Sequence, residues 1–256
     1  MMRFTFLGTG TSQGIPVIGC HCAICTSEDP KDHRLRTSAM VTIGDKNIVI
    51  DTGPDFRQQM LRAGADNVEA ILFTHEHNDH IAGLDDVRPI NFRYKKHIQL
   101  YATPSVQAAL RERFAYAFDE NPYPGAPRLD FVNISKDEII EVAGVKVQPI
   151  EVLHGMGNTV LGFRFNDLVY ITDCKSIEYI EFKKIIGAKV LILNALHHTE
   201  HHSHLNLAQA LEIVNEIKPD KAYFVHINHN MGKIKDVNLT LPVGVELAYD
   251  GLSFEF

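Results

Sequence analysis

Short apolar runs recur along the whole chain, and each ends at a turn residue or a polar cluster. Because these runs are rich in Val, Ile, Phe and Tyr, they predict β-strands. The predicted strands are residues 3–7, 39–43, 47–51, 70–73, 97–101, 145–150, 159–165, 168–172, 189–193 and 221–225. Segments 54–64, 104–118 and 205–217 instead carry apolar residues at helical spacing, so they predict helices. This alternation indicates an α/β fold.

One segment, residues 119–130, contains three prolines and a glycine, which predict a surface loop. The stretches before it, residues 92–97 and 111–118, mix aromatic with basic side chains. They could form a lid or a homodimer surface. We favour the simpler interpretation, a solvated helix face with a buried apolar stripe.

The composition is that of an ordinary globular protein, with 45% hydrophobic and 22% charged residues in 256. We expect one domain, residues 1–256. No apolar run approaches the roughly 18 residues that a membrane helix needs, and Met1–Leu7 does not resemble a leader, so we expect a cytoplasmic protein with no membrane partner. The formal charge of −7 argues against extended nucleic acid as a partner and leaves small anions open.

Histidine is unusually frequent, with 14 residues, and it clusters. The densest cluster follows the apolar run that ends at residue 73, where α/β sheets place their ligands. There, His75 and His77 can project toward one ion, while Asp79 and His80 can reach a second. A His-x-His-x-Asp-His run in this position predicts a metal site.

Three later apolar strands each end near another residue that can bind a metal ion: His154, Asp173 and His226. Each of these alone could be a polar residue satisfied at a strand end. Together with the first cluster they provide seven nitrogen and oxygen ligands, which suits a binuclear centre of zinc, manganese or iron.

Cys20, Cys22 and Cys25 are too crowded to form a disulfide framework among themselves. A closed zinc site needs four ligands, so one is missing. His229 lies three residues after His226, and one loop can therefore supply a histidine to each site. We predict a structural Cys3His zinc site, and we expect the remaining cysteine, Cys174, to be a core residue.

The histidine run followed by a distant His, Asp and His resembles the metallo-β-lactamase superfamily over nearly the whole chain. The resemblance implies a four-layer αβ/βα sandwich. It also implies one metal on His75, His77 and His154, a second on Asp79, His80 and His226, and Asp173 bridging the two. Asp51, in the motif VIDTG, would orient a ligand histidine, unless it is a simple turn aspartate.

The start FTFLGTGTSQGIPVIGC, the cysteines and His229 resemble the PhnP-like branch of this superfamily. The branch implies hydrolysis of a small phosphodiester, including cyclic ones, by a hydroxide that bridges the metals and is oriented by Asp79. His202, aligned through Leu205-Asn206, would protonate the leaving group. His204 is expected to be a supporting residue and is the rival donor.

The other histidines of this loop, His197, His198 and His201, are expected to be solvated or to support the site. Arg88, Asn91 and Arg93 are candidates for holding a substrate phosphate, and a surface role is equally compatible with the sequence.

Two other readings of the same residues stay open. An endoribonuclease resembling tRNase Z shares the metal residues and the FLGTG start, but this acidic chain has no long Gly/Lys-rich insertion. A PqqB-like iron protein of cofactor biosynthesis would not be a hydrolase. The full ligand set favours hydrolysis, because a single redox iron needs only a facial triad.

Overall fold

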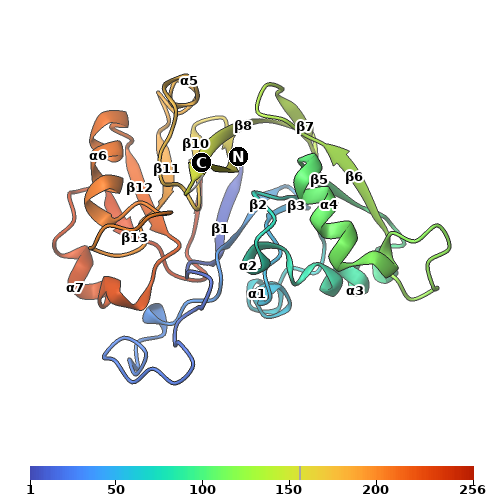
Figure 1. Cartoon of the computed structure of the whole chain (residues 1–256), viewed down its shortest axis with the longest axis horizontal. Helices are drawn as coiled ribbons and strands as arrows, with labels where there is room; N and C mark the ends of the chain where they lie inside the picture. The colour runs from blue at the N-terminus through green and yellow to red at the C-terminus, as the bar shows by residue number, and fades with distance from the viewer. Residues whose placement is uncertain (156) are drawn as a thin grey trace.

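Two mixed β-sheets face each other at the centre of the molecule, and helices cover their outer faces (Figure 1). The computed structural model describes residues 1–155 and 157–256. The first sheet has the strand order β14-β1-β2-β3-β4-β5-β6 and the second has the order β13-β12-β11-β10-β9-β8-β7. This is the four-layer αβ/βα arrangement that the resemblance implied.

The chain builds the first sheet mainly from its N-terminal half. Its strands are β1 (Arg3–Gly8), β2 (Ser38–Ile43), β3 (Lys46–Ile50), β4 (Ala70–Leu72), β5 (Ile98–Ala102), β6 (Leu129–Asn133) and β14 (Ser253–Glu255). From β3 to β6 the strands pair in parallel. The carboxyl ends of β3 to β6 therefore lie at one edge of the sheet.

The second sheet comes from the C-terminal half. Its strands are β7 (Ile140–Val142), β8 (Val145–His154), β9 (Asn158–Phe165), β10 (Leu168–Tyr170), β11 (Val190–Asn194), β12 (Lys221–Val225) and β13 (Val245–Leu247). Strands β10 to β13 are parallel, so their carboxyl ends also share one edge.

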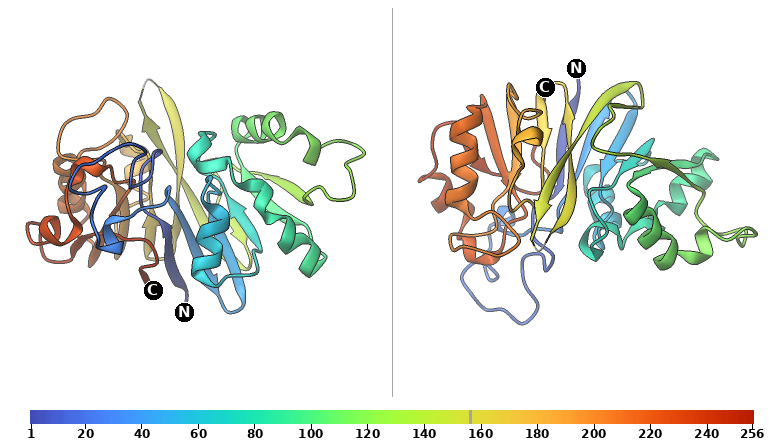
Figure 2. Two further views of the ribbon diagram at one scale, coloured as in Figure 1. Left: turned by 90° about the horizontal axis from the view of Figure 1, so that it is seen from below. Right: turned by 45° about the horizontal axis from the view of Figure 1, so that its top comes forward.

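Three apolar layers hold the sheets and helices together. Between the sheets, Phe4, Phe6 and Ile50 of the first sheet share a buried cluster with Phe163 and Ile192 of the second. The other two layers lie under the helices, which cover the outer faces in the two views of Figure 2. The helices are α1 (Phe56–Ala63), α2 (Asn78–Ile81), α3 (Arg88–Tyr94), α4 (Pro104–Arg113), α5 (Tyr179–Phe182), α6 (Leu207–Ile217) and α7 (Ile234–Asn238), with 3-10 turns at Pro30–Asp32, Leu84–Val87, Ala115–Ala117 and His229–Met231.

Helix α6 shows how the sequence specifies these elements. Asn206 caps its first turn by accepting from the backbone of Gln209, whose side chain in turn accepts from the backbone of Asn206. Leu207, Ala210 and Val214, spaced three and four residues apart, are its buried positions. The helix thus begins at its cap and buries one face against the second sheet.

The predicted strands and long helices are present, but their boundaries differ in places. The expected loop 119–130 is too long, because Leu129 already starts β6. Strand β8 continues to His154, so this residue ends the strand instead of following it. The sequence patterns missed β6, β7, β13 and β14 and the helices α2, α3, α5 and α7. In the described part of the chain no helix is both long and apolar enough to cross a membrane.

Candidate metal centres and active site

The loop after β4 carries the first ligand cluster. His77 is the N-cap of α2, and this short helix turns Asp79 and His80 back toward His75. His75 Nε2 lies 2.9 Å from His77 Nδ1, and His80 Nε2 lies 3.3 Å from Asp79 Oδ2. His75 and His80 are buried, whereas His77 is exposed. The cluster therefore has a dry side against the core and a side open to solvent.

The later strand ends bring their residues to the same place. Asp173 Oδ2 lies 3.3 Å from His80 Nε2, and Asp173 Oδ1 lies 3.2 Å from His226 Nε2. His226 Nε2 also lies 3.7 Å from Asp79 Oδ2. Asp173 and His226 both have a φ of 55°, a left-handed conformation that costs a non-glycine residue on the order of 1 kcal/mol or more. Both residues therefore adopt a strained backbone at the point where their side chains enter the cluster.

The potential ligand atoms form overlapping groups, each with all atoms within 4.8 Å of one another. Four buried nitrogens in these groups, His80 Nε2, His204 Nδ1 and both ring nitrogens of His226, have no hydrogen-bond partner among the described residues. Unpaired buried donors and acceptors are costly unless a partner such as a bound ion satisfies them. The groups are His75, His77 and His154; His75, His80 and Asp173; Asp79, His80 and His226; and His154, Asp173 and His204.

The carboxylates of this cluster favour their charged form. Burial alone would raise the pKa of Asp173, but the neighbouring His226 and His80 rings hold it well below its usual value. The pKa of Asp79 is also lowered: burial opposes this, and His80 and His226 outweigh it. Imidazole nitrogens beside two ionised carboxylates are a donor set suited to divalent zinc, manganese or iron.

A buried hydrogen-bond network orients two histidines of the cluster, His80 and His75. Asp51 Oδ2 accepts from His80 Nδ1 at 2.7 Å and from the Thr74 hydroxyl at 2.8 Å. Because the Thr74 hydroxyl donates to Asp51, it can accept from His75 Nδ1, 2.9 Å away. Both histidines thus donate through Nδ1 and turn Nε2 to the cluster. Asp51 therefore acts on two histidines, and Thr74, which our sequence reasoning missed, links it to one of them.

The loop between β11 and α6 closes the cluster on another side. His154 Nδ1 donates to the Ser203 carbonyl at 2.9 Å, which leaves its Nε2 free in the same way. His204 is buried, with its ring centroid 4.7 Å from both His154 and His226. His202 is exposed, and its ring lies 4.3 Å from that of His201. The structure therefore brings His204 to the ligand cluster and leaves His202 outside it.

The candidate phosphate-holding residues are engaged elsewhere. Asn91 is buried and donates to two backbone carbonyls, so it has a structural role. Arg88 pairs with Asp85, and Arg93 pairs with Asp66. The surface role is the one these contacts support.

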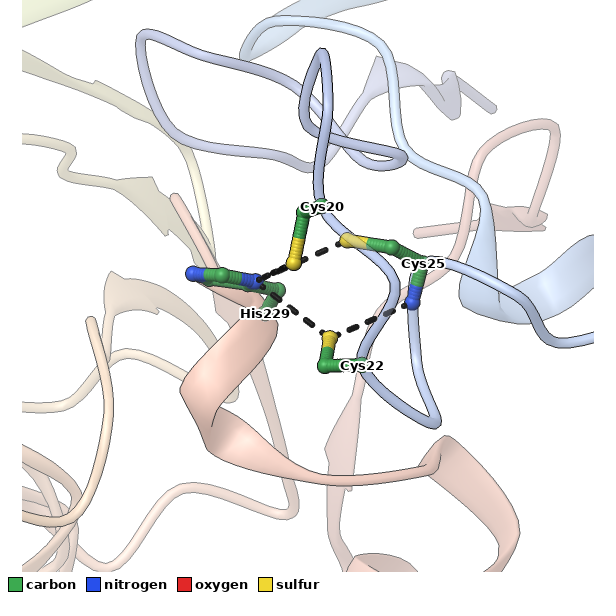
Figure 3. A group of neighbouring side chains, drawn as sticks. All are labelled: Cys20, Cys22, Cys25 and His229. Atoms are coloured by element: carbon green, nitrogen blue, oxygen red, sulfur yellow. Dashed lines mark hydrogen bonds between the residues drawn. The ribbon is translucent and has the colours of Figure 1, made fainter.

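The three cysteines and His229 converge at a separate site, shown in Figure 3. His229 Nδ1 lies 3.3 Å from Cys20 Sγ, 3.4 Å from Cys22 Sγ and 3.5 Å from Cys25 Sγ. One ring nitrogen cannot form three hydrogen bonds at once, but these separations are near the roughly 3.6 Å edge expected for a tetrahedral zinc with sulfur and nitrogen ligands. The four atoms therefore fit a zinc ion at their centre.

Backbone N–H groups donate hydrogen bonds to two of the sulfurs at this site. The N–H of Cys25 donates to Cys22 Sγ, which is the largest contribution lowering the pKa of the Cys22 thiol to about 6. Burial raises the pKa of Cys25 to about 11, against a hydrogen bond from the Val17 N–H. A bound cation would favour the thiolate form of all three sulfurs.

The two sites share one stretch of backbone. Ile227, between His226 and His229, exchanges backbone hydrogen bonds with Thr9 and Thr11 of the N-terminal loop. Asp32 then accepts from Ser27 and from the Ile234 N–H, so it connects the end of the cysteine loop to α7. In Figures 1 and 2 this N-terminal segment accordingly lies beside the C-terminal elements.

Comparison with known proteins gives a consistent picture. Residues 46–227 match the family model of the beta-lactamase superfamily domain. A solved diphosphatase from the PhnP family is 39% identical, with a TM-score of 0.93 over 100% of this chain and 98% of that one. Zinc-bound PqqB from Methylobacterium extorquens shares the fold, with 20% identity and a TM-score of 0.80 over 99% of this chain and 100% of that one.

One curated relative carries a different name. An octanoyltransferase of Porphyromonas gingivalis is 38% identical over 98% of this chain. The match covers 51% of that protein, so this chain spans about half the length of the relative.

Proposed function

Because this chain belongs to the beta-lactamase superfamily and to its PhnP-like branch, we propose that it is a metal-dependent hydrolase of small phosphodiesters. One observation carries the proposal. Unpaired nitrogens of His80 and His226 and the carboxylates of Asp79 and Asp173 meet at one edge of the two sheets. This is the arrangement that a binuclear hydrolytic centre needs.

The chain's own residues would prepare the site in three ways. Asp51, Thr74 and the Ser203 carbonyl hold the ligand histidines in one tautomer, so no reorganisation is needed when substrate binds. Asp79 and Asp173 stay ionised and hold positive charge in place. When bound, two divalent ions supply the Lewis acidity that activates water and neutralises phosphoryl oxygens.

For the leaving group, we keep His202 as the proposed proton donor, because burial and the neighbouring His226 lower the pKa of His204 to about 2 and leave its ring without the proton of an imidazolium. His204 is the histidine of this loop that lies against His154 and His226, whereas His202 is exposed. A general acid must come within hydrogen-bond reach of the leaving oxygen. His204 remains the rival, because it lies against the ligand cluster.

The reacting bond is either a phosphodiester or a diphosphate. A small phosphodiester is what the motifs indicate. The solved PhnP-family relative is a diphosphatase and matches this chain over nearly its full length, which favours a disubstituted diphosphate as the second candidate. Both substrates present a phosphorus atom with two ester-like oxygens to the same centre.

The name octanoyltransferase is a weaker guide. The matched region is about half of that relative, and the other half is long enough to carry the named activity. An octanoyl-transfer assay with this chain alone would test the point, and we expect no transfer.

The test is a substrate panel with protein reconstituted in manganese or zinc. The panel contains bis(p-nitrophenyl) phosphate, a cyclic nucleotide, ribose cyclic phosphate, ADP-ribose and a precursor tRNA. We expect turnover of the small substrates. Cleavage of the RNA alone would favour the nuclease interpretation. If no substrate is hydrolysed and the iron-loaded protein shows redox activity, the PqqB-like interpretation is favoured.

Two matched variants decide the proton donor. His202→Ala is expected to lower kcat by about 100-fold or more for a poor leaving group, since general acid catalysis contributes about 10²–10⁴-fold. The loss should be smaller for p-nitrophenolate, which needs little protonation. If His204→Ala shows this leaving-group dependence and His202→Ala does not, the assignment is reversed.

A further inference from the structure

The loop between β11 and α6 contains a short internal repeat. Residues 197–200 read HHTE and residues 201–204 read HHSH, so each half places a Thr or Ser two residues after a histidine. The first histidines of the two halves, His197 and His201, are half-buried, with ring centroids 6.1 Å apart. Neither is needed for the metal groups described above.

Each half fixes its first histidine by the same contacts. The Thr199 backbone N–H and hydroxyl lie 3.2 and 3.0 Å from His197 Nδ1. The Ser203 backbone N–H and hydroxyl lie 3.3 and 3.2 Å from His201 Nδ1. A backbone N–H can only donate, so both Nδ1 atoms accept. The neutral rings therefore carry their proton on Nε2, the nitrogen that faces away from the turn.

Ser203 connects His201 to the metal cluster. Its N–H is bound to His201, and its carbonyl accepts from the ligand His154. Gly155 allows this approach, since a Cβ on it would lie 2.6 Å from the Ser203 Cβ. The His201 ring is 5.2 Å from that of His204, which in turn lies against His154. The His204 ring thus lies between the His201 ring and His154 of the cluster.

One lysine lies beside the repeat, and the repeat itself carries one exposed carboxylate. Lys175 lies close to this loop, with its Nζ 3.6 Å from the exposed Glu200 carboxylate, which it partly neutralises. His198 donates to the Met231 carbonyl at 2.8 Å and so fastens the loop to the turn after His229. The donors are therefore held by a loop that is attached at several points.

From this arrangement we infer an anion subsite in which His197 and His201 donate their Nε2–H groups to a phosphate of the substrate that does not react. The inference rests on the proposed function and extends it to the substrate class. A substrate with a second phosphate on its leaving side, such as a disubstituted diphosphate, would fill both the metal cluster and the subsite. A simple phosphodiester would fill only the cluster.

Two isosteric variants separate the roles of the two ring nitrogens. His201→Asn keeps an acceptor near the Nδ1 position, so the turn with Ser203 is retained while the outward donor is lost. His201→Gln places an amide N–H near the Nε2 position and should restore the donor. The matched control is His97→Asn, since His97 is exposed and precedes β5 at the end opposite to the metal cluster.

Kinetics with two substrates measure the subsite. His201→Asn is expected to raise KM for ADP-ribose about tenfold, the usual scale for losing one hydrogen bond to a charged group, and to change KM for bis(p-nitrophenyl) phosphate less than about twofold. His201→Gln should recover most of the loss, and His97→Asn should match the unmodified protein. An equal change for both substrates, or no change for either, would overturn the inference.

A binding measurement keeps this inference separate from the proposed function. Calorimetry with inorganic diphosphate on the metal-replete protein needs no turnover, and metal content is measured before and after. If no diester is hydrolysed but affinity falls in His201→Asn and returns in His201→Gln, the subsite stands and the proposed function fails. If diesters are hydrolysed and affinity is the same in all variants, the subsite fails alone. Loss of a metal ion from His201→Asn would overturn the subsite in favour of a cation site.

Discussion

Removing His229 from the Cys3His site should release one zinc ion and lower stability by an amount that depends on free zinc. His229 is the fourth ligand, and it lies 209 residues from Cys20 along the chain. Three cysteines from one short loop then have no partner from the C-terminal half. The change His229→Asn leaves a smaller polar side chain at the start of the 229–231 turn.

The size of the effect follows from ligand linkage. An ion that binds only the folded chain at 100 times its dissociation constant contributes about 2.7 kcal/mol. For a chain of 256 residues, each kcal/mol corresponds to about 2–4 °C in Tm, so a difference of about 5–11 °C is expected. The difference should shrink as free zinc is lowered, because the contribution scales with the logarithm of its concentration.

Thermal melts at buffered free zinc, together with metal analysis, measure both quantities. The catalytic cluster adds the same zinc dependence to both proteins, so the difference between them isolates the Cys3His site. The matched control is His21→Asn, because His21 lies inside the same loop and is exposed. An unchanged zinc content and an unchanged zinc dependence in His229→Asn would refute the assignment of this site.

Three further changes test contacts of the catalytic cluster and the core. Asp51→Asn should weaken metal binding and activity by about 10–100-fold, measured by metal titration, because Asp51 holds His80 directly and His75 through Thr74. Thr74→Val should affect the same measurements less, since it frees only one of the two histidines. Tyr170→Phe should stabilise by about 1 kcal/mol in urea unfolding, because the buried Tyr170 hydroxyl has no hydrogen-bond partner among the described residues. Burial raises the pKa of Tyr170 well above 10, so the unfolded chain loses this proton first and stability falls as pH rises beyond 10; the Phe variant should lack that loss.

The fold was predictable where strands are long and buried on both faces. Parallel strands such as 221–225 are apolar and buried from the second residue on, and a single sequence shows this pattern. The missed strands are short or half-exposed: β14 has no buried residue, and β6 is exposed or intermediate at each position. Their stability comes from pairing with a neighbouring strand, which no local pattern records. The single-domain organisation stays a prediction.

The candidate ligand residues were accessible because each lies at or after the end of a recognisable apolar strand. Their supporting residues were not. Thr74 is an ordinary threonine in the sequence, and its role depends on a carboxylate 23 residues earlier that the parallel pairing of β3 and β4 brings beside it. The only signal was its position directly before His75.

The proton donor shows where spacing stops being informative. His202 and His204 are two residues apart, so an extended loop would point both to the same side, and spacing alone does not separate them. The structure separates them through His154, whose Nδ1 donates to the Ser203 carbonyl and so fixes the peptide unit between the two histidines. With that peptide fixed, His204 is turned inward to the cluster and His202 is left in solvent. A histidine at the end of one strand thus determines which residue of a distant loop lies against the cluster.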